Sequence, residues 1–487
     1  MIIDTLDKDF VRRLDELIIK EMTTLGTPGL SMGIIKGDEL IFTRSYGTRN
    51  YSKSLPVTED TLFLVASVTK SFISSCILKL VEQGKISLED EVNKFVEFEL
   101  GFPDNPIRIK HLMTHTSGIP NLSDLLYHEN EEDTLGYPIS IPKIPFTSID
   151  DIFRHINMAR EYVTDPPGKR FYYNNLMYNI LGFIISKING MSLNDFLSQN
   201  ILVPLEMNRS TLNIDKALAD ENHSEGYITK PGSKTSERVA MTNKIKQLEN
   251  AAGGLYSNIK ELSNYVVMHL NQGRFHEKQV LSPEHIELMQ NLQFVEEYPN
   301  EAFSSFYGNY GKTGYGLGFV IHEDFFGYKL IEHSGSYDGS SAWLAMIPDL
   351  QIGVIFLSNY HPSPRMFAQA VMLMLLGLDV EKNFPLLIVR NHQKKLSGYY
   401  ETYRGIQKIK VFSKLNTLFI QDMEEKRPPQ AIFPSITKGE KLEYLNYYMF
   451  TDIGGMMPVQ FEIDKFGSIW IHIEREKYKK IKELLYD

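Results

Sequence analysis

The chain has 487 residues, 43% of them hydrophobic and 23% charged, which is typical of a globular protein and excludes a disordered or membrane-embedded one. Its length predicts two or three domains. The 51 basic and 61 acidic side chains give a net charge of −10 without a basic block, so nucleic acid is not an expected partner.

The N-terminal residues 1–25 are predicted to form an amphipathic helix, because charged side chains interrupt the apolar ones throughout this segment. Such a pattern excludes the uncharged core of a signal peptide. No stretch approaches eighteen uninterrupted apolar residues, so neither a membrane span nor a membrane partner is expected. The single Cys76 excludes an internal disulfide framework, and we therefore expect a cytoplasmic protein.

Two strands, 29–35 and 39–46, are predicted next, joined at Lys36-Gly37-Asp38, which is a hairpin signal. From Ser67 the apolar residues recur at helical spacing, and Gly84 supplies the stop. That helix is predicted to be buried through most of its length, because so many of its residues are apolar.

The middle of the chain, from about 105 to 300, mixes helical segments with loops rich in Pro, Asn and Ser. Strands then return with β-branched and aromatic residues. The sheet therefore takes strands from both ends of the first domain, and the predicted fold class is α+β, an antiparallel sheet flanked by helices plus a helical subdomain. The returning strands are expected at 318–321, 328–333, 342–347 and 352–357.

The last part of the chain changes character after an apolar helix at 366–378. We predict a large first domain at 1–382, a linker at 383–395 and a small antiparallel β-barrel at 396–487. Within the barrel, short polar and apolar runs alternate, Asp464-Lys-Phe-Gly467 is typical of a hairpin turn, and a short helix is expected at 476–486.

Ser67-Val-Thr-Lys70 supplies a nucleophile and a base. A serine hydroxyl needs a base at neutral pH, and a lysine three residues later on a helix lies on the same face. Desolvation among apolar neighbours would favour the neutral amine, and the start of the helix would stabilise an oxyanion at the N–H of Ser67. The pattern alone is weak, because Ser-x-x-Lys also occurs at Ser140/Lys143, Ser257/Lys260 and Ser435/Lys438.

Two further motifs complete a set for acyl transfer. In Tyr173-Asn-Asn175 the phenol can relay protons and the amide can orient the acyl group or the lysine, although Tyr-x-Asn recurs elsewhere in the chain. His333-Ser-Gly335 is the single His-x-Gly, and the glycine would let substrate lie against the strand while the N–H of Ser336 serves as second oxyanion donor.

His111 and His115 stand four residues apart, a spacing that can bind zinc on a helix. The sequence offers no third ligand, and a structural turn at residues 116–120 explains the pattern better. We therefore expect no metal and no other cofactor.

Together these residues resemble the serine β-lactamase and penicillin-binding-protein superfamily, in its class C, CubicO-like branch. The resemblance runs from about Gly29 to Asn359 and is carried by blocks at residues 58–72, 111–120, 167–182, 252–257 and 333–335, in the family's order.

The resemblance implies that Ser67 is acylated, that Lys70 and Tyr173 share the base role, and that Asn175 is the amide of the second motif. His333 takes the place of the usual lysine, as in many esterase and peptidase members. Because histidine is largely neutral at pH 7, it binds an acidic group less well than an ammonium, so peptide or ester hydrolysis is expected ahead of penicillin resistance.

The leading hypothesis is a peptidase in which His333 helps to activate the deacylating water, and a carboxylesterase with the same machinery is the alternative. A protein that binds or senses a ligand without hydrolysis is a third reading. The segment from Leu396-Ser-Gly-Tyr-Tyr-Glu401 is similar to the lipocalin-like barrels of CubicO-type peptidases, some of which assemble into compartments. The barrel could cap the cleft, form a homo-oligomer or carry an apolar ligand.

Overall fold

The computed structural model describes residues 6–97, 102, 104–120, 149–229, 238–241, 250–295, 310–337, 339–360, 365–414, 417–424, 428–434, 446–450 and 455–484. Contacts divide these residues into a larger unit that extends to Met372 and a smaller unit from Leu373 onward. Each unit has its own hydrophobic core.

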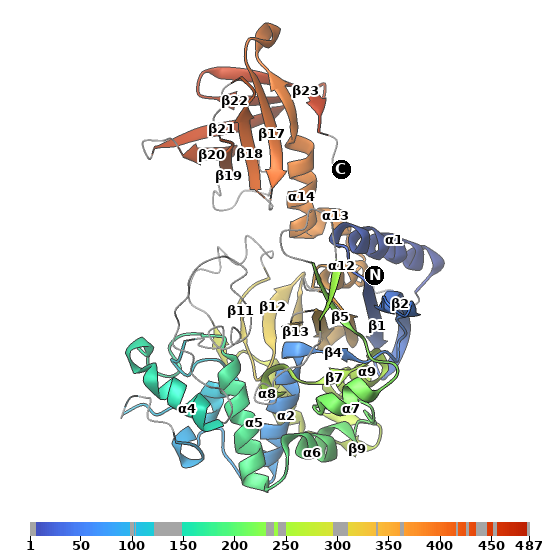
Figure 1. Ribbon diagram of the computed structural model, residues 1–487, viewed down its shortest axis with the longest axis vertical. Coiled ribbons are helices and arrows are strands. Elements are labelled where there is room, and N and C mark those ends of the chain that lie inside the picture. The colour runs from blue at the N-terminus through green and yellow to red at the C-terminus, as the bar shows by residue number, and fades with distance from the viewer. Residues whose placement is uncertain are drawn as a thin grey trace. The chain divides into compact units, whose positions relative to one another are not determined.

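The larger unit is built on a nine-stranded antiparallel sheet, in the order β10-β11-β12-β13-β14-β15-β1-β2-β3 (Figure 1). Pairing of β1 with β15 confirms that strands from both ends of this unit share one sheet. The strands are β1 (Gly29–Lys36), β2 (Glu39–Asn50), β3 (Leu55–Pro56), β10 (Phe294–Val295), β11 (Thr313–Tyr315), β12 (Val320–Phe325), β13 (Tyr328–Tyr337), β14 (Ser340–Ile347) and β15 (Ile352–Ser358).

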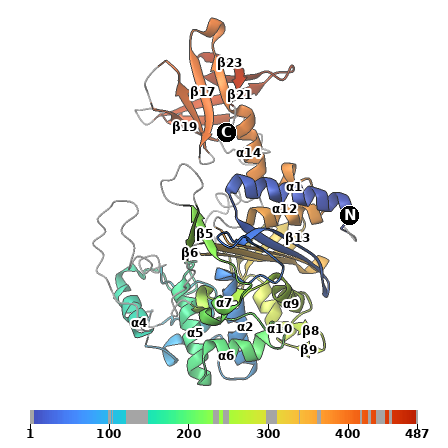
Figure 2. The same ribbon diagram turned by 45° about the vertical axis from the view of Figure 1, so that its right-hand side comes forward.

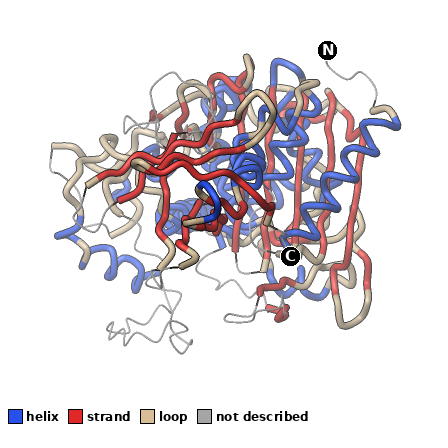
Figure 3. Tube along the Cα trace, turned by 90° about the horizontal axis from the view of Figure 1, so that it is seen from above, coloured by secondary structure: helices blue, strands red, loops and turns tan. Residues whose placement is uncertain are grey.

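The central strands are apolar on both faces because helices cover both faces. On one face lies α1 (Lys8–Leu25), together with the start of α12 (Arg365–Leu375), where Phe367 stacks on Phe356 of β15 at 6.3 Å between ring centroids. Figure 2 shows both helices above the sheet, and Figure 3 shows α1 running over its strands. On the other face α9 (Ile259–Leu270) packs against β1 and β15.

The helical region contains the helix that follows Ser67 and the helices around it. α2 (Thr69–Glu82) is buried along nearly its whole length, as its apolar sequence predicts. The others are α3 (Ile109–Met113), α4 (Ile149–Met158), α5 (Asn175–Asn189), α6 (Leu193–Leu197), α7 (Ile214–Ala219), α8 (Asn250–Gly253) and α10 (Pro283–Gln290). Three short strand pairs link this region: β4 (Phe63–Leu64) with β7 (Tyr256–Ser257), β5 (Gly226–Thr229) with β6 (Arg238–Met241), and β8 (Arg274–Phe275) with β9 (Lys278–Gln279).

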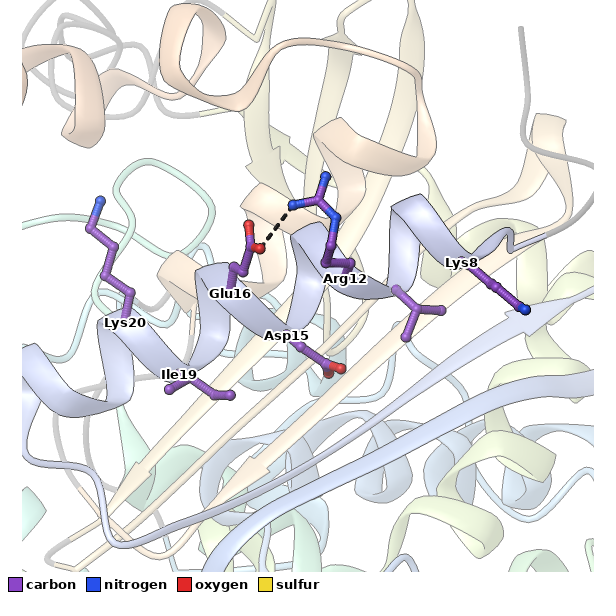
Figure 4. Close-up of a pocket in the computed structure, with 7 residues that line it drawn as sticks. Lys8, Arg12, Asp15, Glu16, Ile19 and Lys20 are labelled. Atoms are coloured by element: carbon purple, nitrogen blue, oxygen red, sulfur yellow. Dashed lines mark hydrogen bonds and ion pairs between the residues drawn. The ribbon is translucent and has the colours of Figure 1, made fainter.

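The predicted N-terminal helix is present as α1. Its carboxylate cap is Asp7, which accepts the N–H of Phe10 at 2.7 Å, and it ends at Gly26 in the left-handed conformation. The outward face holds a shallow hollow lined by residues of this helix alone, among them Arg12, which pairs with Glu16 at 2.8 Å (Figure 4). Among the described residues, no helix is both long and apolar enough to cross a bilayer.

The smaller unit is a closed antiparallel barrel of eight strands, preceded by α13 (Val380–Asn383) and α14 (Pro385–Leu396). The predicted linker at 383–395 is thus mostly helix, and its Pro385 stands at the first helical position, where its missing N–H costs no hydrogen bond. The barrel strands are β16 (Gly398–Glu401), β17 (Lys408–Lys414), β18 (Thr417–Asp422), β19 (Gln430–Pro434), β20 (Asn446–Phe450), β21 (Met456–Ile463), β22 (Ile469–Ile473) and β23 (Glu476–Glu483).

The prediction of a helix at 476–486 is wrong, because this segment contains strand β23. It pairs with β22 on one side and with β16 on the other, and so closes the barrel. Lys and Glu are good helix formers, but the hydrogen bonds of two neighbouring strands outweigh that weak preference. The hairpin turn predicted at Asp464–Gly467 lies between β21 and β22 as expected.

Candidate functional site

Ser67 lies in a single 3-10 turn, Ala66–Val68, immediately before α2. Its neighbours Ala66 and Val68 are buried, whereas Ser67 itself is half-buried and open to solvent. Ala66 has φ +46°, a left-handed conformation that is costly for a residue with a side chain. A strained backbone therefore holds Ser67 between two buried neighbours in a half-buried position.

Lys70 is completely buried, and three oxygen atoms surround its amine. Nζ lies 3.1 Å from Oγ of Ser67, 2.8 Å from Oδ1 of Asn175 and 2.7 Å from the carbonyl oxygen of Ala252. Burial lowers the pKa of Lys70 well below its usual value. Since the amide and carbonyl oxygens can only accept, a neutral amine gives them its two hydrogens and turns its lone pair toward Ser67.

Tyr173 ends the loop before α5 and is half-buried, with its ring centroid 4.8 Å from Nζ of Lys70. Burial raises the pKa of its phenol, and a hydrogen bond with Ser67 acts in the opposite direction. The phenol is consequently protonated at neutral pH and can donate. Asn174, which the sequence reasoning assigned no role, caps α5 by accepting the N–H of Leu176 at 2.9 Å.

Gly335 brings strand β13 directly against the turn that carries Ser67. A Cβ atom at this position would lie 2.1 Å from the carbonyl oxygen of Val65 and 3.0 Å from the backbone nitrogen of Ser67. The glycine is therefore required by the contact between two backbones. Ser336, the next residue, is exposed, and its N–H remains the predicted second oxyanion donor.

His333 is buried on the same strand, and both of its ring nitrogens have partners. Nδ1 lies 2.7 Å from the carbonyl oxygen of Ser334, so Nδ1 carries the hydrogen, and Nε2 accepts the hydroxyl of Tyr315 at 2.9 Å. Burial, and then the nearby charge of Lys70, lower the pKa of His333 to about 3. Its imidazole is neutral, with its lone pair already in a hydrogen bond.

Tyr315 was not among the residues singled out from the sequence. It stands on β11, two strands away from the His333 strand β13 and eighteen residues before His333, and the flanking glycines in Thr313-Gly-Tyr-Gly were its only signal. The sequence pattern predicts a strand here but not its register, so the hydroxyl could not be placed at Nε2 in advance.

His115 lies behind Tyr173 in an aromatic cluster. Its ring centroid is 4.3 Å from that of Tyr173, 5.1 Å from Tyr178 and 4.9 Å from Tyr315, and its Nδ1 accepts the N–H of Asn174 at 3.0 Å. Burial keeps the pKa of His115 well below its usual value. This imidazole supports the loop that presents Tyr173.

His111 and His115, which have the spacing of a zinc site on a helix, do not lie on one face of a helix. The helix α3 ends at Met113, and His115 lies beyond it with φ +59°. Nδ1 of His111 accepts the N–H of Arg108 at 3.1 Å, which caps the start of α3. Each histidine therefore accepts a backbone N–H at the start of a helix: His111 accepts that of Arg108 before α3, and His115 accepts that of Asn174 before α5.

Comparisons with known proteins agree with this architecture. A family model described as Beta-lactamase matches residues 14–379, and a model described as Pab87 octamerisation domain matches residues 380–479. The octameric penicillin-binding protein homologue from Pyrococcus abyssi superimposes with a TM-score of 0.80 at 29% identity, covering 96% of this chain and all of that one. A class C beta-lactamase mutant superimposes with a TM-score of 0.58 at 20% identity over 77% of this chain and 98% of its own, which shows a shared fold.

Among curated relatives, Protein flp from Staphylococcus aureus strain MW2 is 24% identical over 359 residues, which is 73% of this chain and 64% of that protein. The chain thus spans about two thirds of the length of the curated relatives it matches. The barrel is matched by a model named for assembly, and the likeness to lipocalins stays a prediction.

Proposed function

This chain belongs to the beta-lactamase family, and from that premise we propose that it is a hydrolase that forms a covalent acyl-enzyme on Ser67. The observation that carries the proposal is the surrounding of Lys70: a buried amine 3.1 Å from Oγ of Ser67, with two further contacts to oxygens that can only accept. A lysine held in this way is a base for the serine rather than a surface charge.

In the acylation step, neutral Lys70 takes the proton of Ser67 while Oγ adds to the substrate carbonyl carbon. The resulting oxyanion would be held by the N–H groups of Ser67 and Ser336, which the close approach of β13 to the nucleophile turn supports. Tyr173, protonated at neutral pH, gives a proton to the leaving group as the carbonyl re-forms. Lys70 then reprotonates Tyr173, so that the protons balance and the two residues share the base role.

In the deacylation step, water adds to the serine ester while a base takes one of its protons, and that proton ends on Oγ of Ser67 as the serine leaves. We propose His333 as a residue of this step, because its neutral imidazole offers a base at Nε2. That lone pair accepts the Tyr315 hydroxyl, so the water must displace this hydroxyl or pass its proton through it.

The proposed substrate is a peptide, and a carboxylic ester is the second candidate. In both cases the neutral His333 stands where the family's lysine would attract an acidic group, which argues against penicillins as the main substrates. Relative rates on short L- and D-amino-acid peptides and on p-nitrophenyl esters separate the two candidates.

The test of the acyl-enzyme is intact-protein mass spectrometry after exposure to a fluorophosphonate, comparing the wild type with Ser67→Ala. One adduct on the wild type and none on the variant is the expected result. A folded wild type without an adduct would contradict the proposal and favour a protein that binds a ligand without hydrolysis.

We also propose that the chain forms a homo-oligomer through its barrel, with a hydrolase domain at 1–382, a linking segment at 383–395 and a barrel domain at 396–487. The match to an octamerisation domain over 380–479 supports this proposal, as does the octameric relative that the chain covers in full. The mass of the particle in solution, measured by light scattering, tests it.

A further inference from the structure

The barrel carries a group of large apolar side chains on its outer surface. Phe433 on β19, Tyr448 and Phe450 on β20, and Met456 on β21 form this group, which we call the apolar patch. The three rings lie 5.6 to 5.9 Å apart between centroids, so they form one continuous surface. Phe433, Phe450 and Met456 are 37%, 53% and 69% exposed.

The patch follows from the alternation of side chains along each strand. Phe433 lies opposite Tyr448, and Phe450 lies opposite Met456, so all four point to the same side of the barrel wall. The residues between them, including Ile432, Tyr447, Met449 and Val459, point inward and fill the barrel core. The outer side chains therefore do not belong to the barrel core.

The segments that carry the patch also lack charge, and the one charged residue of β21, Glu462, lies near its end, beyond these segments. Residues 430–434, 446–450 and 456–461 contain no Asp, Glu, Lys or Arg. Lysines are frequent on two other strands of the barrel, β17 and β23, at positions 408, 410, 414, 477, 479, 480 and 482. Depletion of charge together with enrichment in aromatic residues and Met is typical of the centre of a protein interface.

We propose that the apolar patch is the centre of a contact with the same patch on a second copy of this chain. The inference rests on the proposed oligomer and names the surface that forms it. An uncharged patch needs no complementary charge on its partner, so it can pair with itself about a two-fold axis. The octamerisation-domain match spans all four residues.

The closed barrel explains why side chains must make this contact. Its eight described strands form a ring without a free edge, so a second copy cannot add a strand to it. One self-paired patch links two copies, and an assembly larger than a dimer needs a second kind of interface that also includes the barrel. Loss of the patch should therefore reduce the mass of the particle to half or less.

The first test is light scattering on the full-length wild type, the double variant Phe450→Glu/Met456→Glu, and the control Phe466→Glu. Phe466 is 83% exposed on the turn between β21 and β22, outside the patch. We expect the double variant to have half the wild-type mass or less, and the control to keep the wild-type mass. A double variant of unchanged mass would overturn the patch, whereas a monomeric wild type would overturn the proposed oligomer as well.

The second test does not depend on a disruptive charge. The only cysteine, Cys76, is buried, so Met456→Cys introduces one accessible thiol. A short bismaleimide should join two copies of Met456→Cys into a dimer on a denaturing gel, and should leave Phe466→Cys as single chains. Absence of the dimer, when the thiol reacts fully with a monofunctional maleimide and the particle keeps its wild-type mass, would contradict pairing of the patch.

Discussion

At the scale of single residues, the buried amine of Lys70 makes the first prediction. Lys70→Arg replaces a base that can be neutral with a guanidinium that stays charged, so acylation should slow by about 10²- to 10⁴-fold. Stopped-flow acylation by a fluorogenic ester measures this. Lys79→Arg, on the same helix but paired with Glu82, is the control and should keep the wild-type rate.

The same amine predicts the pH dependence of acylation. Because burial places the pKa of Lys70 well below its usual value, the neutral base is available at neutral pH, and acylation falls as the pH drops through that lowered pKa. His333, with a pKa of about 3, contributes no ionisation above pH 5. A pH profile of kcat/KM for His333→Asn with the same acid limb as the wild type would agree with this assignment, and a lost acid limb would contradict it.

Tyr315 gives a third prediction at this scale. Tyr315→Phe removes the donor that holds Nε2 of His333 in its neutral form, so the pKa of His333 rises and the pH at which deacylation declines moves upward. Burst kinetics separate deacylation from acylation, and only deacylation should change. Tyr328→Phe, on β13 with His333, is the control. A deacylation profile that does not move would show that the Tyr315 hydroxyl has no part in this step.

The residues of the candidate site were predictable from the sequence where they belong to local motifs. Ser67 and Lys70 are three residues apart on one turn, and their spacing alone places Nζ near Oγ. Tyr315 and His115 reach the site only through the register of the sheet and an unusual φ angle, and neither is encoded by spacing along the chain. Their contribution becomes visible only in three dimensions.

At the scale of elements, the approach of β13 to the turn that carries Ser67 gives a fourth prediction. Gly335→Ala places a Cβ 2.1 Å from the carbonyl oxygen of Val65, so the strand or the turn must shift. The variant should lose most labelling of Ser67 and about 1–3 kcal/mol of stability, the usual cost of overpacking. Ser334→Ala, exposed on the same strand, should change neither. Fluorophosphonate labelling and thermal unfolding measure both effects.

The elements themselves were mostly predictable, because their patterns are strong and local. The hairpin after β1, the buried α2 and the strands β12 to β15 follow from periodicity and turn residues. β23 was not, because a segment of Lys and Glu favours a helix by composition and becomes a strand through its two neighbours in the barrel. The failure lies where tertiary pairing overrides a weak local preference.

At the scale of the whole molecule, the division into two units predicts that the larger unit carries the reaction and the barrel carries the assembly. Every described residue that contacts Lys70 lies in the larger unit, which has its own core. A chain ending at Asn383 should therefore keep the labelling rate of Ser67 within a few fold and should be a monomer by light scattering. A folded truncation that no longer reacts would show that the barrel contributes to the hydrolase chemistry.

The charge of the chain is unevenly divided between these units. Residues 380–487 contain 18 Lys and Arg against 14 Asp and Glu, whereas residues 1–379 contain 33 against 47. The barrel segment alone is thus weakly basic and the remainder strongly acidic. Repulsion between the acidic parts of neighbouring copies weakens with added salt, so salt should favour the assembled particle.

The contacts of Lys70 with residues of its own chain have a kinetic consequence. Since one chain supplies Ser67, Lys70, Tyr173, Asn175 and His333, the proposed mechanism needs no residue from a second copy. Specific activity should then stay constant through a dilution series that dissociates the particle, and saturation curves should be hyperbolic without cooperativity. Assembly would in that case limit which large substrates reach the site, and each copy would turn over bound substrate independently of the others.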